Sequence, residues 1–275
     1  MKRRAQPWLG TLVEITIFDE VFDNIAFDMA FASIARDHAL MSFHAPDSDV
    51  SKINQATLNT PIQVAAETYA VLQTALLIGR ASSGLFNIAC APRMVAWEFL
   101  PDIASSSSSD NPVQAHEALW LTSDQSVIKR QPCLIDLGGI AKGFAVDQAL
   151  FALQQAGVHH ACINAGGDLR CMGESAIPVW IRHPRFADTP PIPQILQNRA
   201  MATSGTYFSA KTLRDDKVSA LVNGINLQAV IKLSSASVVA ESCMVADALT
   251  KVVIATENAY HSLLQQFSAH AIYLD

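Results

Sequence analysis

Residues 135–150 read IDLGGIAKGFAVDQAL, and this stretch shows most clearly how the chain folds. A short apolar run leads into two glycines, and apolar residues at helical spacing then continue as far as Gly157. The pattern predicts a buried strand at 132–137, a glycine turn, and a helix that begins near Lys142. The helix dipole and the first N–H groups favour an anion at such a junction. The order matches neither GxxxxGK[ST] nor GxGxxG, so glycines used for tight packing remain the alternative.

The chain downstream consists of short strands separated by further glycine turns. NAGGD at 164–168 is typical of a hairpin turn, and TSG at 203–205 offers hydroxyl groups beside a mobile backbone. The segment 242–255, SCMVADALTKVVIA, has the spacing of an amphipathic helix. Alternation and β-branched residues predict strands at 159–165, 179–183, 198–204 and 270–274, and ASVVA at 236–240 leads into that helix.

The first half of the chain has weaker signals. Alternation predicts a strand at 10–19, and apolar spacing predicts helices at about 21–40 and 65–80. Loops are predicted at 41–54, 82–94 and 102–112 from their Pro, Asp, Ser, Asn and Gly residues. Adjacent strands outnumber a simple strand-helix alternation, so we expect an α+β fold with mixed or antiparallel sheets. No repeat or linker divides the chain, which favours a single domain over residues 1–275.

Composition excludes several classes of protein. Of the 275 residues, 50% are apolar and only 16% are charged, which is typical of a globular domain with a large core. The formal net charge of −6 argues against a nucleic-acid binder. Charges interrupt every apolar stretch before about 18 residues, the length that a spanning helix needs. We therefore expect no transmembrane segment.

The N-terminus and the cysteines bear on the compartment. The opening MKRRAQPWLG has basic residues but no apolar run behind them, so it is not a complete signal peptide. We expect a cytoplasmic protein as the chain stands, or a periplasmic or membrane-anchored one if a signal or lipoprotein segment was removed. The five cysteines form no CxxC pair and are odd in number, which favours buried free thiols over a disulfide framework.

Taken in order, six stretches resemble the motifs of the ApbE family, the FAD:protein FMN transferases. They are MSFHAPDSDVSKIN at 41–54, GLFNIACAPRM at 84–94, DLGGIAKGFAVD at 136–147, NAGGD at 164–168, TSG at 203–205 and ADAL at 246–249. The likeness runs from LGT at residue 9 to about residue 256 and includes the aromatic residues Trp97 and Phe99. Six motifs in the order of the family argue against a chance match.

The resemblance implies an enzyme that uses FAD and Mg²⁺. Such enzymes attach FMN through a phosphoester to a Thr or Ser of a target flavoprotein and release AMP. Carried onto this chain, it implies that Asp247 and Lys142 have catalytic roles. The implied FAD contacts are His44, Phe86, Asn87, Asp136, Lys142, Gly166, Gly167, Ser204 and Gly205. The implied Mg²⁺ contacts are the Gly139 carbonyl, the Asp247 carboxylate and Thr250.

Several positions depart from the motifs. The hydroxyl residue that the family has four places after the metal-binding Asp is replaced by Lys251, and Thr250 comes one place earlier. Either the Thr250 hydroxyl substitutes, or the Lys251 ammonium supplies the positive charge. Ser219 stands where the family has a candidate catalytic His, and Asn87 and Ala89 replace an Asp and a Thr.

These departures keep two other hypotheses open. One is a protein that binds FAD, or hydrolyses it to FMN and AMP, without modifying a target. The other is a structural or interaction domain that has lost the ligand, in which Asp247 and Lys251 form an ordinary surface salt bridge at i and i+4. The retained Asp136, Lys142 and Asp247 weigh against the second. The chain contains no acceptor motif, so the acceptor is expected to be another protein.

Overall fold

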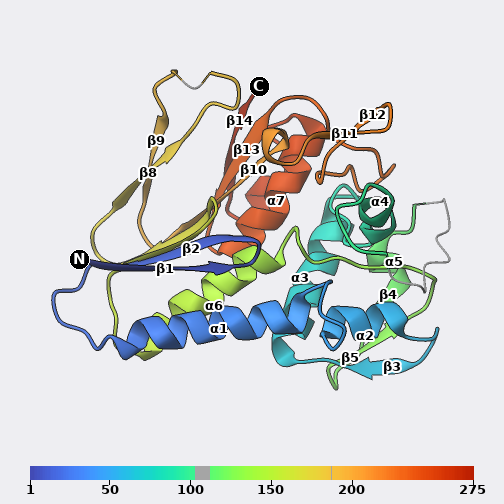
Figure 1. Cartoon of the computed structure of the whole chain (residues 1–275), viewed down its shortest axis with the longest axis horizontal. Helices are drawn as coiled ribbons and strands as arrows, with labels where there is room; N and C mark the ends of the chain where they lie inside the picture. The colour runs from blue at the N-terminus through green and yellow to red at the C-terminus, as the bar shows by residue number, and fades with distance from the viewer. Residues whose placement is uncertain (103–111, 187) are drawn as a thin grey trace. The chain divides into compact units, whose positions relative to one another are not determined.

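The computed structural model describes residues 1–102, 112–186 and 188–275, and these residues form two compact units. Unit 1 consists of residues 1–38, 140–205 and 233–275, and unit 2 consists of residues 39–139 and 206–232. Figure 1 labels the helices and strands of both. The prediction of a single domain over residues 1–275 stays a prediction.

Unit 1 is built on a seven-stranded sheet with the order β1-β2-β6-β7-β10-β13-β14, in which every neighbouring pair is antiparallel. The strands are β1 (Lys2–Trp8), β2 (Thr11–Ile17), β6 (Ala161–Ala165), β7 (Asp168–Met172), β10 (Ala200–Gly205), β13 (Ser235–Ala240) and β14 (His270–Leu274). A separate hairpin pairs β8 (Ile177–Ile181) with β9 (Ile192–Leu196). The strands predicted at 159–165, 198–204 and 270–274 are confirmed as β6, β10 and β14, and the strand predicted at 179–183 begins two residues earlier as β8. The α+β class is confirmed as well.

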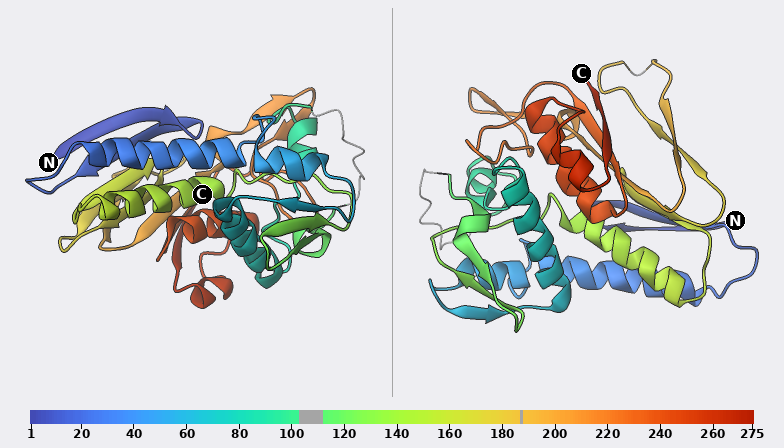
Figure 2. Two further views of the ribbon diagram at one scale, coloured as in Figure 1. Left: turned by 90° about the horizontal axis from the view of Figure 1, so that it is seen from below. Right: turned by 180° about the vertical axis from the view of Figure 1, so that it is seen from behind.

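The two faces of the large sheet bury different partners. The helices of unit 1 are α1 (Ile25–Met41), which ends in unit 2, α6 (Ala141–Gln155), α7 (Cys243–Thr256) and the short α8 (Leu263–Gln266). Alternate residues of β2 and β6, such as Ile15 and Ile163, pack with side chains of α1 and α6. Leu169 and Met201 point to the other face, where they pack with β8 and β9. Figure 2 shows α6 and α7 from two further directions.

Unit 2 combines short helices with two small sheets. Its helices are α2 (Asp49–Gln55), α3 (Ala66–Ala81), α4 (Ala91–Ala96), α5 (Ala115–Ala118) and the 3₁₀ turn η1 (Thr206–Phe208). Its strands are β3 (Pro61–Gln63), β4 (Leu119–Leu121), β5 (Ser126–Lys129), β11 (Lys211–Leu213) and β12 (Asp216–Val218). The three-stranded sheet has the order β3-β5-β4, and β11 pairs with β12. The helix predicted at 65–80 is confirmed as α3.

Two predictions in unit 2 are wrong in detail. The expected loop at 41–54 ends in helix α2, because the Ser48 hydroxyl accepts from the Ser51 N–H and caps a first turn. The segment 132–137, expected to be a strand, joins no sheet of the described residues. Its place in a ladder is taken by the Asn54 side chain, which donates to the Ile135 carbonyl at 2.9 Å and accepts from the Ile135 N–H at 2.8 Å. A side-chain amide can replace a strand because it offers the same donor and acceptor.

The remaining loop predictions have mixed outcomes. The loop expected at 82–94 runs into α4, which begins at Ala91. The loop expected at 102–112 lies almost entirely outside the described residues. All five cysteines are free thiols, as predicted. Within the ranges that the structure describes, no helix combines the length and the apolar character needed to cross a bilayer.

Candidate functional site

The residues implicated by the sequence fall in both units, and each set is described by itself. Unit 1 contains Lys142, Gly166, Gly167, Ser204, Gly205, Asp247 and Thr250. Unit 2 contains His44, Phe86, Asn87, Asp136 and Gly139. In the unit 1 set, Lys142 lies at the start of α6, and Asp247 and Thr250 lie in the second and third turns of α7.

Asp147 of α6 fixes the start of α7. Its carboxylate accepts from the Cys243 N–H at 2.8 Å and the Met244 N–H at 2.9 Å, and Arg170 donates to the same carboxylate at 2.8 Å. Ser242 completes the cap by accepting from the Val245 N–H at 3.2 Å. Burial raises the pKa of Asp147, although the Arg170 charge and the two N–H groups oppose that rise. The sequence does not reveal this role, because Asp147 looks like one more polar residue of a helix.

Replacing Asp147 with Ala should lower the free energy of unfolding by about 2 kcal/mol, the upper end for loss of a helix cap. Two N–H groups of α7 and the half-buried Arg170 would lose their acceptor. Urea unfolding followed by circular dichroism measures the change. Asp47→Ala, which removes an exposed carboxylate, is the control and should change little. Equal losses in the two variants would contradict the capping role.

Gly143 lets α6 and α7 approach closely. A Cβ added at this position would lie 2.3 Å from the Cys243 carbonyl oxygen and 2.8 Å from the Met244 Cα. The Gly143 N–H, in the first turn of α6 and without a partner inside the helix, donates to Asp247 Oδ2 at 3.3 Å. Packing therefore requires the glycine at position 143. This agrees with the alternative interpretation of the sequence, in which the glycines serve tight packing.

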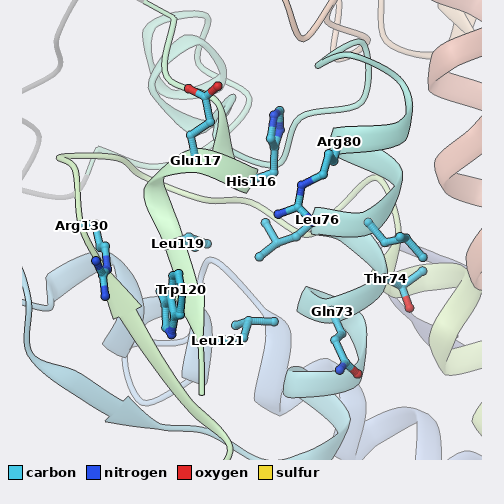
Figure 3. Close-up of a pocket in the computed structure, with 11 residues that line it drawn as sticks. Gln73, Thr74, Leu76, Arg80, His116, Glu117, Leu119, Trp120, Leu121 and Arg130 are labelled. Atoms are coloured by element: carbon cyan, nitrogen blue, oxygen red, sulfur yellow. The ribbon is translucent and has the colours of Figure 1, made fainter. Parts of the chain in front are cut away.

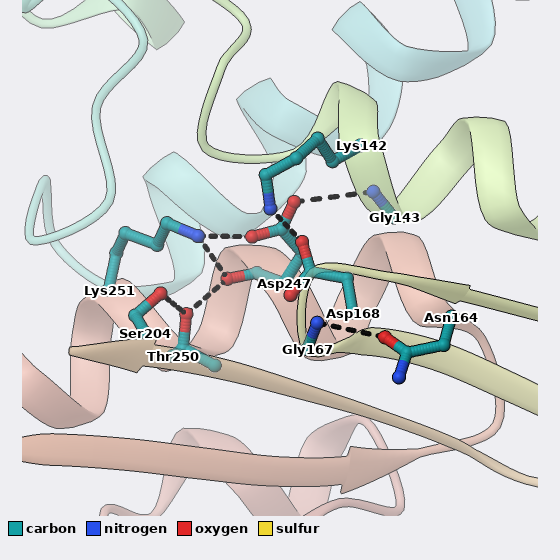
Figure 4. A network of polar contacts seen from close by, with 9 residues as sticks. All are labelled: Lys142, Gly143, Asn164, Gly167, Asp168, Ser204, Asp247, Thr250 and Lys251. Atoms are coloured by element: carbon teal, nitrogen blue, oxygen red, sulfur yellow. Dashed lines mark hydrogen bonds and ion pairs between the residues drawn. The ribbon is translucent and has the colours of Figure 1, made fainter. Parts of the chain in front are cut away.

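Two lysines and two aspartates form what we call the charge cluster, consisting of Lys142, Asp168, Asp247 and Lys251 (Figure 4). The Lys142 ammonium pairs with Asp168 Oδ2, and the Lys251 ammonium pairs with Asp247 Oδ1. Lys251 also donates to the Asp247 main-chain carbonyl at 3.1 Å. The side chains of Asp247 and Asp168 are 0% and 1% exposed, whereas those of Lys251 and Lys142 are 15% and 31% exposed. The charge cluster thus has no net charge, and its two carboxylates are almost completely buried.

The two carboxylates of the charge cluster respond differently to burial. Burial alone would raise the pKa of Asp247, but the ammonium groups of Lys142 and Lys251 outweigh it, and the pKa lies below its ordinary value. Burial and the neighbouring Asp247 charge raise the pKa of Asp168. Burial would lower the pKa of Lys142, yet the two carboxylates overcome that effect and raise it. Lys142 and Asp247 are therefore both charged near neutral pH.

A chain of hydroxyl groups lies beside the charge cluster. Thr250 donates to the Asp247 main-chain carbonyl at 2.6 Å, and its oxygen lies 2.7 Å from the Ser204 Oγ. Because the single Thr250 proton is used, Ser204 is the donor in the second bond. Gly166 and Gly167 form the β6–β7 turn at φ +64° and +102°, and the Gly167 N–H donates to Asn164 Oδ1 at 2.9 Å. The predicted hairpin turn at 164–168 is confirmed.

The side chains around Asp247 do not suit Mg²⁺ well. A hard divalent cation requires several oxygen ligands, and the sequence suggested the Asp247 carboxylate and the Thr250 hydroxyl among them. Here Asp247 Oδ1 already holds an ammonium group, and the Thr250 oxygen already accepts a hydrogen bond from Ser204. Over residues 1–102, 112–186 and 188–275, no three or more His, Cys, Asp and Glu side chains group as metal ligands. The predicted contact of Gly139 with Mg²⁺ stays a prediction.

In unit 2, Asp136 and Asn87 are the polar residues with the clearest roles. Asp136 is half-buried and accepts from the Gly138 N–H at 3.1 Å. Burial raises its pKa, while the Gly138 N–H and the His44 charge oppose the rise. The Asn87 amide donates to the Val113 and Gly224 carbonyls and accepts from the Ala89 and Ala115 N–H groups. An Asp at position 87 could not donate to those carbonyls, which explains the amide.

The other unit 2 residues do not form a common cluster of polar contacts. His44 is exposed, whereas Phe86 is buried. Ser219, which stands at the position of the family's candidate catalytic His, is fully buried and bonds within its own turn. Its hydroxyl accepts from the Leu221 N–H at 2.9 Å. Ser219 therefore serves the local backbone.

A cavity of about 660 Å³ lies in unit 2, between α3 and the β4–β5 strands (Figure 3). The Trp120 ring on its wall is stacked by the Arg130 guanidinium, 4.7 Å from the ring centroid. None of the sequence-predicted site residues lines this cavity. The candidate chemistry therefore rests on the charge cluster and not on this cavity.

Curated relatives of this chain are FAD:protein FMN transferases. The protein from Haemophilus influenzae is 28% identical over 188 residues, which cover 62% of this chain and 54% of the relative. The protein from Vibrio cholerae is 28% identical over 227 residues, which cover 76% of this chain and 66% of the relative. The chain thus spans between about half and two thirds of the length of these relatives.

Solved structures share the fold. The ApbE protein from Thermotoga maritima superposes with a TM-score of 0.86 at 22% identity, over 99% of this chain and 93% of that one. The flavin transferase ApbE from Vibrio cholerae gives a TM-score of 0.81 at 21% identity, over 99% and 92% of the two chains. The model of the ApbE family matches residues 9–273, nearly the whole sequence. By that match, this chain is a member of the ApbE family.

Proposed function

We propose that this chain is an FAD:protein FMN transferase, which moves FMN from FAD to a Thr or Ser hydroxyl of a target flavoprotein and releases AMP. The observation that carries the proposal is the charge cluster, in which Lys142 at the start of α6 and Asp168 at the start of β7 meet Asp247 and Lys251 of α7. It lies in a chain that matches the ApbE family from residue 9 to residue 273. A Lys at a helix start is suited to hold a phosphate, because the ammonium and the helix dipole both favour negative charge.

The proposed reaction is a phosphoryl transfer. The acceptor hydroxyl oxygen attacks the phosphorus of the FMN half of FAD and forms the new P–O bond. The bond from that phosphorus to the bridging oxygen breaks, the electron pair leaves with AMP, and the hydroxyl proton is released. Such reactions ask the protein chiefly to position the groups and to neutralise the developing charge. Lys142 is suited to that task because its ammonium stays charged and its side chain is 31% exposed.

The family resemblance also predicts Mg²⁺, which when bound would neutralise charge on the diphosphate. We assign no step to it, because Asp247 and Asp168 already hold ammonium groups. The acceptor flavoprotein is a partner of the proposed reaction whose identity the chain does not specify.

Intact-mass spectrometry tests the proposal. The chain is incubated with FAD and a candidate acceptor flavoprotein that lacks its flavin, in parallel with Mg²⁺ and with EDTA. Transfer adds the mass of FMN less one water to the acceptor and releases one AMP per acceptor. FMN and AMP without a modified acceptor would instead support an FAD hydrolase, and intact bound FAD would support a binding protein. Both alternatives are included as outcomes because Ser219, which bonds to its own turn, stands where the family has a candidate catalytic His.

Replacing Lys142 with Ala should weaken FAD binding by roughly 1–3 kcal/mol, the range for a hydrogen bond to a charged group. The substitution removes the ammonium that would contact the phosphate. Titration followed by flavin fluorescence measures the affinity. Lys142→Arg keeps the charge and should lose less, and Lys217→Ala, on an exposed position of β12, should lose nothing. Unchanged affinity in Lys142→Ala would remove Lys142 from the binding site.

A further inference from the structure

Every oxygen of Asp247 is already engaged by a donor from unit 1. Its Oδ1 holds the Lys251 ammonium, and its Oδ2 accepts from the Gly143 N–H at 3.3 Å. Its main-chain carbonyl accepts from the Thr250 hydroxyl at 2.6 Å and from Lys251 at 3.1 Å. The Lys251 ammonium thus contacts Asp247 at both its carboxylate and its carbonyl, as a cation bound between two oxygen ligands would (Figure 4).

Lys251 differs from an ordinary helix-surface lysine. The chain offers a direct comparison in Lys52, which pairs with Asp49 at i and i+3 in α2. The carboxylates of both pairs are buried, but the Lys52 side chain is 51% exposed, whereas the Lys251 side chain is 15% exposed. A long side chain loses rotamer freedom and hydration when it is buried in this way, so its position must be stabilised by strong contacts. The contacts with Asp247 provide them.

The net charge of the cluster disfavours a second cation next to the Lys251 ammonium. Two carboxylates and two ammonium groups sum to zero in the charge cluster. A divalent cation at the Asp247 carboxylate would raise the sum to +2 and would lie within a few ångströms of the ammonium. Charges at that separation repel strongly in a poorly solvated environment. The ammonium and a divalent cation therefore exclude one another at Asp247.

We infer that the Lys251 ammonium is the resident cation of the charge cluster, and that it occupies the place on Asp247 that a divalent cation would need. The chain thus carries its own positive charge at this position and binds no Mg²⁺ or Mn²⁺ through Asp247. The inference does not depend on flavin transfer, because it concerns only the competition between an ammonium and a metal ion for one carboxylate.

Lys251→Thr should convert the cluster into a cation site. The substitution removes one positive charge, leaves the Asp247 carboxylate without its ion pair and supplies a hydroxyl oxygen one helical turn away. A hard divalent cation favours such oxygen ligands. Lys251→Met is the matched comparison, because it removes the charge but supplies no oxygen.

Mn²⁺ binding, followed by electron paramagnetic resonance and calorimetry without flavin or acceptor, tests the inference. In the wild type, any Mn²⁺ binding should be unchanged by Asp247→Asn. Lys251→Thr should bind one Mn²⁺ at least tenfold more tightly than wild type, and adding Asp247→Asn should abolish that binding. Lys251→Met should bind more weakly than Lys251→Thr. Lys52→Thr, which removes the more exposed lysine of the α2 pair, should behave as wild type.

Thermal unfolding provides a second measurement, which remains informative if Lys251→Thr destabilises the fold. Lys251→Thr should melt at a lower temperature than wild type in EDTA and recover with Mn²⁺ or Mg²⁺, whereas wild type should not respond. Wild-type Mn²⁺ binding that Asp247→Asn removes would overturn the inference. So would a Lys251→Thr variant that gains neither metal binding nor thermal recovery, including one that stays unfolded when Mn²⁺ is added. Loss of flavin transfer alone would bear on the proposed function and not on this inference.

Discussion

Asp247→Ala should lower the free energy of unfolding by about 3–5 kcal/mol, the range for removing one partner of a buried ion pair. The variant leaves the Lys251 ammonium buried without its carboxylate and gives the cluster a net positive charge, since only Asp168 remains to offset Lys142 and Lys251. It also removes the acceptor of the Gly143 N–H. Flavin transfer should be lost together with the fold of the charge cluster. Urea unfolding gives the stability, and intact-mass assays give the transfer.

An exposed ion pair and a double substitution control this result. Glu14→Ala disrupts the surface pair with Arg3 and should change stability by less than about 1 kcal/mol. Asp247→Leu combined with Lys251→Met replaces the pair by apolar side chains and should recover much of the loss, because neither charge is then left buried alone. A loss of only about 0.2–0.5 kcal/mol in Asp247→Ala would assign the pair to an ordinary helix surface.

The sequence predicts β2, β6, β10, α6 and α7 of unit 1 because their signals are local, but it does not predict β1, β9 or β13. Alternation in β2 and β6, the two glycines before β7 and the apolar spacing of α6 are all visible within a few residues. The strand expected at 132–137 failed for a reason that no local pattern contains. Its backbone bonds to the side chain of Asn54, 81 residues away in sequence. Long-range side-chain contacts of this kind cannot be read from periodicity.

The charge cluster was only half visible in the sequence. The spacing of Asp247 and Lys251 at i and i+4 puts them on one helix face, which the sequence shows directly. The partner of Lys142 was hidden, because Asp168 looks like the last residue of a glycine turn. Which of Thr250 and Lys251 faces the carboxylate also required the structure, since positions i+3 and i+4 lie on nearly the same face.

Gly143→Ala should destabilise the fold by about 3 kcal/mol or more, the upper range for overpacking a core. On an exposed helix the same change would stabilise by up to about 1 kcal/mol, because Ala is the better helix former. The sign reverses here because the new Cβ would overlap main-chain atoms of Cys243 and Met244, which cannot rotate away. The start of α7 would have to move, and the Asp147 cap would lengthen with it. Urea unfolding measures the loss.

Gly79→Ala in α3 is the graded control for Gly143→Ala. Its added Cβ would meet the Phe86 carbonyl oxygen at 3.2 Å, a contact that a shift of a few tenths of an ångström relieves. The loss should therefore be clearly smaller than at Gly143. A gain of stability in Gly143→Ala would mean that α6 and α7 can separate without cost, and the geometry of the charge cluster would then not depend on their contact. A large loss accompanied by weaker FAD binding would instead tie the position of Lys142 to the close approach of the two helices.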